Sequence, residues 1–418
     1  MLERPSMHEW SCQEIARRVR DGDVSAEEVV THHLDRIESR GELNAFITVD
    51  RERSLVAARS LAREGRMGAL AGVPFAPKDL FDTAGLRTTY GSAIFRDHVP
   101  TRTATAVQRI VDAGGVIVGK ANLHEFAWGV TSKNPFYGTV GNPRRPGRIA
   151  GGSSGGSAAA LSAGLAALSI GTDTGGSIRI PSYACGTSGF KPSHGLVPID
   201  GCYPLAPAFD HAGPMARTME ECALALEVLA GVPQPEPRLA GLRIGVLGPI
   251  VDMHRLEAAG AHCEEAALPA WEHALPLFAA QCAYTHRELY PARRDEYSPD
   301  LQRKMAPGFE LAAVTYRALW DEVDAWRVRC ARELHYDLLV APTLPCDLPL
   351  VEEEETPEYR ARITATVRPF NWLGWPSATT RDGVLFSGQS DETVLAAALA
   401  WEAELPPAHT FPAEPRTY

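Results

Sequence analysis

Several features that mark membrane or secreted proteins are missing from this sequence. No run approaches the roughly 18 consecutive apolar residues that a membrane-spanning helix needs, although 45% of the 418 residues are hydrophobic. The eight cysteines are scattered and form no C-x-x-C pair. That spacing favours free thiols in a reducing compartment over a disulfide framework or a zinc site. The N-terminal MLERPSMHEWSCQE is polar and has no apolar signal-peptide core. We therefore expect a cytoplasmic protein.

Concentrated positive charge is also missing. The formal net charge is −11, and lysine and arginine form no cluster longer than two or three residues. A nucleic-acid-binding surface is therefore not expected. The acidic run Glu352–Glu355 is interpreted as a solvated loop face.

Short β-rich runs alternate with helical patterns along the chain. Capping boxes at Ser11–Glu14 and Ser25–Glu28 predict two early helices, and Ala45–Val49 reads as a strand. Further strands are predicted in VPFAPKDLF, GGVIVGK, LAALSIGT, LRIGVLG and DLLVAPTLP, with helical patterns such as TATAVQRIVDAG and MEECALALEVLAG between them. This alternation predicts an α/β protein with a central sheet.

The run GGSSGGSAAALSAGLAALSIGTDTGGSIRIP, from Gly151 to Pro181, carries two serine-bearing glycine turns. Glycine lets a backbone approach a ligand closely, so glycines before a serine suggest N–H groups turned toward a developing negative charge. A flexible linker is the alternative. It fits poorly, because AAALSAGLAAL and ALSIGT are apolar elements of helix or strand length.

Together with Lys78 in PFAPKDLFDTAG, this run closely resembles the amidase signature family of serine hydrolases. GALAGVPFAPKDLFD, GGVIVGKANLHEFAWG, NPFYGTVGNP, GTDTGGSIRIPSYACGTSGFKPSHG and FDHAGPMARTMEE follow in the family's order, and weaker echoes such as RPFNWLGWPSA lie near the far end. The resemblance implies an amide hydrolase without a metal or organic cofactor. It also implies a single α/β domain over 1–418, with a mixed central β-sheet flanked by helices.

One Pro-rich connector, GVPQPEPRLAG at 231–241, divides the chain. It separates a catalytic core at 60–230 from a C-terminal part at 242–418, which is shorter than is usual in the family. The family resemblance implies that this shortened part packs on the same sheet.

The resemblance also implies the roles of individual residues. Ser177 is the nucleophile, Ser153 is a bridging serine that follows a cis peptide bond from Gly152, and Lys78 completes a Ser-Ser-Lys relay. The remaining implied site consists of oxyanion and substrate-binding donors at Thr174, Gly175 and Gly176, and supporting residues at Ser154, Asp173 and Arg179.

Lys78 must be uncharged to act as a base. A free lysine has a pKa of about 10.4 and is almost entirely protonated near pH 7. Burial among the apolar residues of GVPFAPKDLF would lower that pKa. The alternative is an ordinary lysine that pairs with Asp79.

Other patterns predict different chemistry. Ser153 and Ser154 each satisfy the G-x-S-x-G elbow of α/β-hydrolase esterases, for which His409 would lie late enough in the chain, but the preceding RRPGRIA is a poor strand. Gly114–Lys120 resembles a P-loop but is followed by alanine where a Mg²⁺-binding hydroxyl must stand. Ser188–Lys191 spells S-x-x-K but is followed at once by proline, which disfavours the helix that this motif needs.

The substrate is the least constrained property. Phe126, Ala127 and Trp128 lie in a segment that resembles a pocket-forming part of the family, although aromatic residues also serve as ordinary core. Arg362 and Arg368 leave an acidic substrate open. We expect a small-molecule amide, neutral or aryl rather than one with a carboxylate, no nucleic-acid or membrane partner, and leave a homodimer open.

Two other functions stay open. One is the ammonia-supplying glutaminase component (the A subunit) of a tRNA-dependent amidotransferase, which would need partner chains. The other is a non-catalytic binding protein with the same fold.

Overall fold

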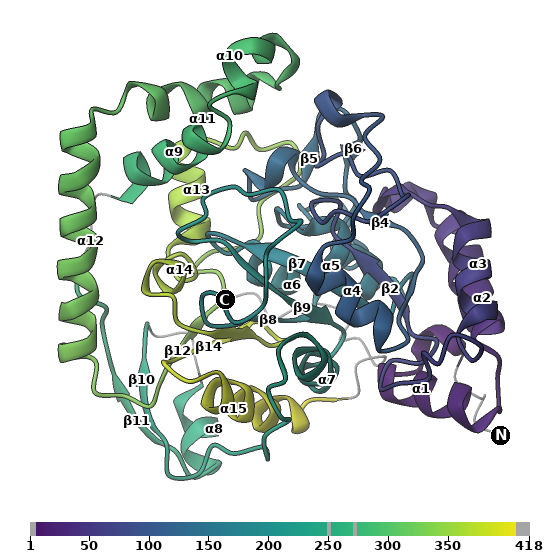
Figure 1. Ribbon diagram of the computed structural model, residues 1–418. Coiled ribbons are helices and arrows are strands. Elements are labelled where there is room, and N and C mark those ends of the chain that lie inside the picture. Colours follow the sequence, from purple (N-terminus) through teal and green to yellow (C-terminus); the bar gives the residue numbers. More distant parts are fainter. Residues whose placement is uncertain (1–5, 249–251, 271–273, 407–418) are drawn as a thin grey trace.

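The centre of the computed structural model is a ten-stranded sheet that mixes parallel and antiparallel neighbours (Figure 1). The structure describes residues 6–248, 252–270 and 274–406. The strand order is β11-β10-β12-β14-β13-β8-β9-β7-β2-β3. Strands β11, β10 and β12 at one end are mutually parallel, as are β7, β2 and β3 at the other, and the strands between them are antiparallel. The predicted α/β class with a mixed central sheet is confirmed.

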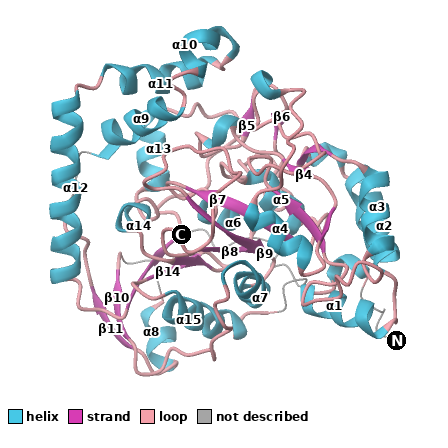
Figure 2. Ribbon diagram, in the orientation of Figure 1, coloured by secondary structure: helices cyan, strands magenta, loops and turns pink. Residues whose placement is uncertain are grey.

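Figure 2 separates the strands from the helices that surround them. The strands of the large sheet are β2 (Pro74–Pro77), β3 (Val116–Ile117), β7 (Leu168–Asp173), β8 (Ser188–Lys191), β9 (His211–Ala216), β10 (Arg243–Val246), β11 (His262–Glu265), β12 (Leu338–Pro342), β13 (Ser377–Thr379) and β14 (Val384–Ser387). Two small two-stranded sheets pair β1 (Phe46–Thr48) with β4 (Lys120–Ala121) and β5 (Lys133–Asn134) with β6 (Gly138–Thr139).

The helices range from single turns to 21 residues. The α-helices before the connector are α1 (Cys12–Asp21), α2 (Ala26–Ser39), α3 (Arg51–Ser60), α4 (Thr105–Asp112), α5 (Gly155–Ser162), α6 (Arg179–Cys185) and α7 (Met219–Ala230). Those after it are α8 (Met253–Ala258), α9 (Ala274–Thr285), α10 (Leu289–Arg293), α11 (Pro299–Glu310), α12 (Ala313–Glu333), α13 (Pro357–Thr364), α14 (Pro369–Leu373) and α15 (Asp391–Ala403). Short 3₁₀ turns are Met7–Glu9, Gly41–Leu43, Ala93–Phe95, Glu125–Ala127 and Arg294–Glu296.

The sheet separates two apolar cores. Successive side chains of a strand point to opposite faces, and in β12 Leu338 and Val340 join one core while Leu339 and Ala341 join the other. The first core includes residues of α7 and α15, which lie below the sheet in Figure 1. The second includes residues of α11, α12 and α14. Helices therefore cover both faces.

The two early helices begin where their caps predict, but the two caps differ. At Ser25 the capping box is complete, because Glu28 also returns a bond to the Ser25 backbone. At Ser11 only the serine side chain caps the helix. The carboxylate of Glu14 instead binds Arg17 and Arg18, so the predicted box is half formed there.

The chain on both sides of the connector contributes to the large sheet. Strand β13 pairs antiparallel with β8, so Ser377 lies opposite Lys191 in the middle of the sheet.

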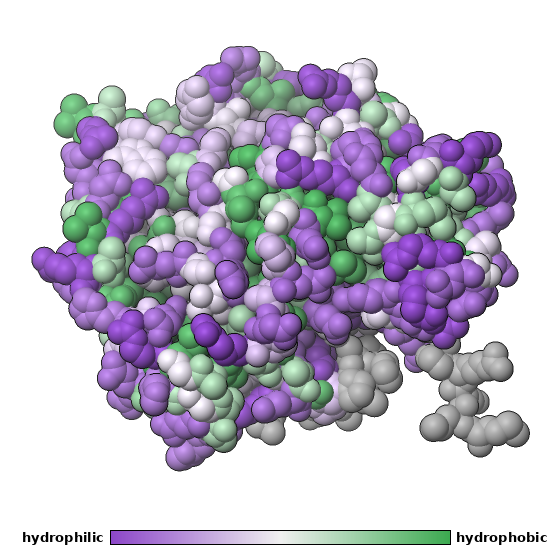
Figure 3. Space-filling view, turned by 60° about the horizontal axis from the view of Figure 1, so that its bottom comes forward, coloured by the Kyte–Doolittle hydropathy of each residue, from purple (hydrophilic) through white to green (hydrophobic). Residues whose placement is uncertain are grey.

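All eight cysteines are free thiols. Of the helices in 6–248, 252–270 and 274–406, none is long and apolar enough to cross a membrane. The face in Figure 3 is largely hydrophilic, with hydrophobic side chains gathered near its middle.

Candidate active site

Two parallel neighbouring strands bring Lys78 to the first glycine turn. Strands β2 and β7 are parallel and adjacent, so their carboxyl ends lie at one edge of the sheet. Lys78 directly follows β2, and its backbone N–H donates to the carbonyl oxygen of Ile170 in β7 at 3.1 Å. The Lys78 Nζ donates to Ser153 Oγ and to Thr172 Oγ1, both at 2.7 Å. Lys78 and Ser153, which are 75 residues apart in the chain, are thus in direct contact.

None of the described carboxylates forms an ion pair with the Lys78 amine. Its side chain is fully buried. The alternative pairing with Asp79 does not occur, because Asp79 accepts bonds from Thr89 and lies 3.3 Å from the Nζ of Lys120. Burial lowers the pKa of Lys78 to about 7. A large part of the lysine population is therefore neutral near pH 7.

The two serine turns are joined through their backbones. The Gly152–Ser153 peptide bond is cis, as predicted. The Ser154 N–H donates to the Ser177 carbonyl oxygen at 3.3 Å, and the Ser154 hydroxyl donates to the Thr172 carbonyl at 3.3 Å. Position 152 accepts only glycine, since an added methyl group would lie 2.8 Å from the backbone nitrogens of residues 131 and 132.

A buried ion pair holds the second turn. Arg179 Nη2 lies 2.9 Å from Asp173 Oδ1, and both side chains are inaccessible to solvent. The Asp173 carboxylate also accepts the N–H groups of Gly176 at 2.8 Å and Ile178 at 3.0 Å, and an amide N–H of Asn371 at 2.8 Å. Burial alone would raise the pKa of Asp173, but the charge and hydrogen bonds of Arg179 hold it well below its usual range. Asp173 therefore stays ionised and fixes the loop around Ser177.

Of the three expected oxyanion donors, Gly176 has its N–H engaged by Asp173. The other two, Thr174 and Gly175, lie immediately before it. The Thr174 hydroxyl donates to Asp210 Oδ1 at 2.6 Å, which ties this turn to the neighbouring loop. Ser177 itself is 7% exposed.

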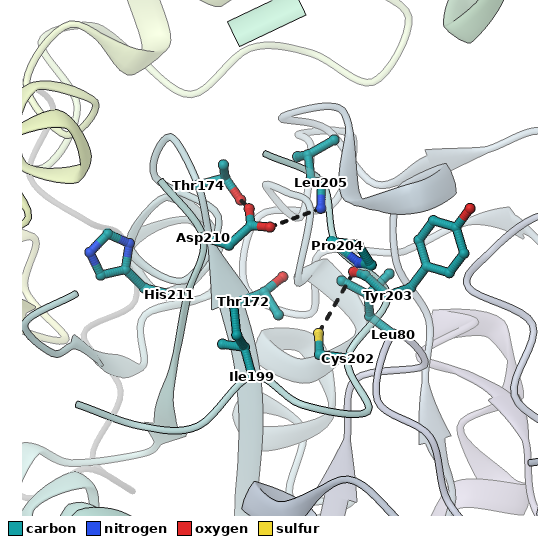
Figure 4. A pocket seen from close by; sticks show the side chains of 10 residues that line it. All are labelled: Leu80, Thr172, Thr174, Ile199, Cys202, Tyr203, Pro204, Leu205, Asp210 and His211. Atoms are coloured by element: carbon teal, nitrogen blue, oxygen red, sulfur yellow. Dashed lines mark hydrogen bonds between the residues drawn. The ribbon is translucent and has the colours of Figure 1, made fainter. Parts of the chain in front are cut away.

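A small cavity adjoins these groups (Figure 4). About 250 Å³ of space, part of it open to solvent, lies between its lining residues. These include Thr172 and Thr174, which contact Lys78 and Asp210. Asp210 closes one side of it by also accepting the Leu205 N–H at 2.9 Å. Its lining consists of Leu80, Thr172, Thr174, Ile199, Cys202, Tyr203, Pro204, Leu205, Asp210 and His211.

The aromatic segment expected at the pocket lies behind it. Phe126, Ala127 and Trp128 are buried in the second core and are absent from the lining of this cavity. The Phe126 ring packs on Tyr203, with 5.0 Å between ring centroids, and Tyr203 lines the cavity. Phe126 thus packs behind one lining residue of the cavity.

Sequence reasoning missed several residues of this site. Thr172 contacts Lys78. It lies on a predicted strand two residues before Thr174, and this position is the only feature of the sequence that points to a place in the site. Asp210 and His211 stand in FDHAGPMARTMEE, a segment to which the motif assigns no catalytic residue. Both are buried and both line the cavity.

The competing motifs do not form their sites. Ser188–Lys191 is strand β8 rather than the start of a helix, and Lys120 is bonded to Asp79 and Thr88. No group of His, Cys, Asp and Glu side chains that could hold a metal ion occurs among the described residues. His409, the histidine of the esterase alternative, lies outside the described residues.

The family model, the related sequences and the solved structures that match this chain all point to one family. The Amidase family model matches residues 28–240. The chain is 41% identical to a Chromohalobacter salexigens protein named as the A subunit of glutamyl-tRNA(Gln) amidotransferase, over 65% of this chain and 63% of that protein. It is 33% identical to the protein of the same name from Koribacter versatilis, over 88% of this chain and 91% of that protein. A crystal structure described as an amidase superposes with a TM-score of 0.85 at 31% identity, over 95% of this chain and all of the other.

Proposed function

Because this chain belongs to the amidase signature family, whose members act on amide C–N bonds, we propose that it hydrolyses a small amide through an acyl-enzyme on Ser177. The observation that carries this proposal is the 2.7 Å contact between Lys78 Nζ and Ser153 Oγ. A buried lysine that donates to hydroxyl groups and pairs with no carboxylate of the described residues is suited to take up a proton.

The proton moves in two steps. Neutral Lys78 accepts the hydroxyl proton of Ser153, while Ser153 accepts that of Ser177, whose oxygen attacks the carbonyl carbon. The N–H groups of Thr174 and Gly175 are the proposed donors to the negative oxygen of the tetrahedral intermediate. Ser153 then passes a proton to the departing nitrogen, so the C–N bond breaks and the amine leaves neutral. In the second half of the reaction, water attacks the ester carbonyl while Ser153, backed by Lys78, takes up its proton. The ester bond to Ser177 then breaks, Ser153 returns a proton to the Ser177 oxygen, and the acid is released.

A fluorophosphonate probe tests the nucleophile, because it forms a covalent bond with an activated serine. We expect the probe on the peptide that contains Ser177, and no labelling of Ser177→Ala. Ser154→Ala is the matched control, since it removes a neighbouring hydroxyl that the mechanism does not use. An adduct on Ser153 or Ser154 would contradict the assignment.

A second candidate is favoured by the names of the relatives. Both of these sequence relatives are named as amidotransferase A subunits, which supports the alternative better than a hydrolase of neutral or aryl amides. A chain of that kind would release ammonia from glutamine and would need partner chains. Ammonia release from glutamine and from simple amides by the purified chain separates the two. Turnover of simple amides without glutaminase activity supports a self-sufficient hydrolase.

A further inference from the structure

One cation beside the nucleophile turn has no part in the proposed relay. Arg368 immediately precedes α14 and lies over Gly175. A methyl group placed on Gly175 would lie 3.6 Å from Arg368 Nε and 3.9 Å from its Cγ, with no other described atom within 4 Å beyond the chain neighbours. A methyl group on Gly176 would instead overlap Val367 at 2.5 Å. The space above Gly175 is thus open except for the Arg368 side chain.

The backbone that carries Arg368 is fixed to the nucleophile turn. Arg179 donates to the Val367 carbonyl at 2.7 Å and to Asn371 Oδ1 at 2.7 Å. Asn371 in turn donates to Asp173 at 2.8 Å. These bonds lie on both sides of Arg368, so its position relative to Ser177 does not depend on a mobile loop.

The Arg368 guanidinium is unpartnered. Three buried cations each lie beside a carboxylate: Arg179 at 2.9 Å from Asp173, Lys120 at 3.3 Å from Asp79, and Lys304 at 3.0 Å from Glu355. The fully buried Lys78 and Lys191 instead donate to hydroxyl or carbonyl oxygens. The side chain of Arg368 makes no hydrogen bond or ion pair with any residue in 6–248, 252–270 or 274–406. Burial, with the charge of Arg360 as a second cause, lowers the pKa of Arg368 to about 10.

The Arg368 residue is partly exposed, so a ligand can reach its side chain. A guanidinium has five N–H donors and stays charged, so it favours an acceptor of negative charge. Its planar fork matches the two oxygens of a carboxylate. A ligand that brings a carboxylate to the space beside Gly175 would satisfy it.

We infer that Arg368 binds a carboxylate of the substrate, so that the preferred substrates are short dicarboxylic acid monoamides. The inference rests on the proposed function, because the short reach from Gly175 to Arg368 places the carboxylate a few bonds from the carbonyl that Ser177 attacks. It replaces the preference for neutral amides that the sequence predicts.

The same turn offers no free carboxylate for an α-ammonium group. Asp173 already accepts bonds from Arg179, Gly176 and Ile178. Asp210 accepts the Thr174 hydroxyl and the N–H groups of Leu205 and Ala206. A monoamide without an ammonium group, such as succinamic acid, therefore fits better than glutamine.

The test compares kcat/KM for succinamic acid, butyramide and glutamine. For the wild-type chain we expect kcat/KM to be highest for succinamic acid and lower for both butyramide and glutamine. Arg368→Gln should lower kcat/KM for succinamic acid about 10- to 100-fold, mainly through KM, and leave butyramide within about twofold. Arg368→Lys should restore part of the loss, since it keeps the charge but not the fork. Arg362→Gln, a change of an exposed arginine on the neighbouring helix, is the matched control and should change neither substrate.

Three results would overturn the inference: equal losses on succinamic acid and butyramide in Arg368→Gln, no loss on either, or a wild-type preference for butyramide or glutamine. Fluorophosphonate labelling of Ser177 is measured on the same samples. If the chain labels at Ser177 but shows no preference for the substrate with a carboxylate, the proposed function stands and only this inference is wrong. A chain that does not label at Ser177 loses the proposed function itself. Protection of Ser177 from the probe by succinate in wild type, and not in Arg368→Gln, supports the inference without relying on turnover.

Discussion

At the scale of single residues, the charge state of Lys78 decides when the relay works. Its pKa is lowered by burial to about 7, and only the neutral form accepts a proton. Below that pH the lysine is protonated and acylation is slow, whereas above it the neutral form prevails. We expect the rate of acylation to rise tenfold per pH unit below about pH 7 and to level off above it. Single-turnover measurements between pH 5 and 10 would show this, and an inflection near 10 would contradict it.

The hydroxyl of Thr172 should also influence the pKa of Lys78, and this can be tested by substitution. Its hydroxyl accepts a bond from Lys78 at 2.7 Å, and an acceptor favours the protonated lysine. Thr172→Val keeps the shape and removes the acceptor. The inflection of the pH–rate profile should therefore move to lower pH in this variant, and Thr172→Ser should leave it in place. A shift to higher pH would mean that the hydroxyl does not bind the protonated form.

Two arginines near Ser177, the fully buried Arg179 and the partly exposed Arg368, should respond differently to removal of their charge. Arg179→Met strands the Asp173 carboxylate in a fully buried site, and breaking a buried pair costs about 3–5 kcal/mol. Arg368→Met strands no partner, so the free energy of unfolding should stay the same or rise. Denaturant unfolding of both variants measures the difference. Equal losses would show that Arg368 has a structural partner in the fold.

At the scale of elements, short sequence patterns predict where helices begin, but they do not predict which side chains pair across the fold. The capping box at Ser25 lies within one short segment, so the sequence predicts the start of α2 correctly. The box at Ser11 fails in part because Arg17 and Arg18 compete for Glu14, and the strength of such competition is not readable from spacing. Likewise the acidic run is only partly the predicted solvated loop face: Glu352 and Glu354 are exposed, but the side chain of Glu355 is 8% exposed and pairs with Lys304 of α11.

The positions of the serines and Lys78 were predictable because a long, specific motif carries them. Arg368 could be named as a candidate but not placed, because its position depends on bonds between Arg179 and a segment almost 200 residues away. The occupied carboxylates of Asp173 and Asp210 depend on tertiary contacts in the same way. Side chains at the meeting point of distant segments are therefore what the sequence alone left open.

The first turn of α5 supplies an element-scale prediction. Alanine normally stabilises a helix relative to glycine, but a methyl group on Gly156 would lie 2.3 Å from the Asn122 carbonyl oxygen. Gly156→Ala should therefore lower the free energy of unfolding by about 1–3 kcal/mol and slow acylation, since Ser153 and Ser154 precede this turn. Gly41→Ala, where no atom lies within 4 Å, is the control and should be nearly neutral. A stabilised Gly156→Ala chain would mean that α5 does not pack so closely on Asn122.

At the scale of the whole molecule, the groups of the proposed relay precede the connector but depend on the C-terminal part of the chain. Strand β8 has β13 as a neighbour, with Ser377 opposite Lys191. The ion pair of Arg179 and Asp173 is completed by Asn371. The Pro-rich connector thus marks a break in composition along the chain, while the sheet and the site run across it.

The dependence of the site on the C-terminal part can be tested by dividing the chain. A fragment of residues 1–241 keeps Lys78, Ser153 and Ser177 but loses β13 and the partners of Arg179, which leaves β8 with an unpaired edge and Arg179 with unmet donors. We expect this fragment to lack cooperative unfolding and fluorophosphonate labelling, and co-expression with residues 242–418 to restore both. The control is a protease site placed within 232–237, where the connector has no regular structure and is partly exposed. Cleavage there keeps all strands together and should leave activity intact. A fragment 1–241 that unfolds cooperatively and labels at Ser177 would show that the catalytic core is self-sufficient.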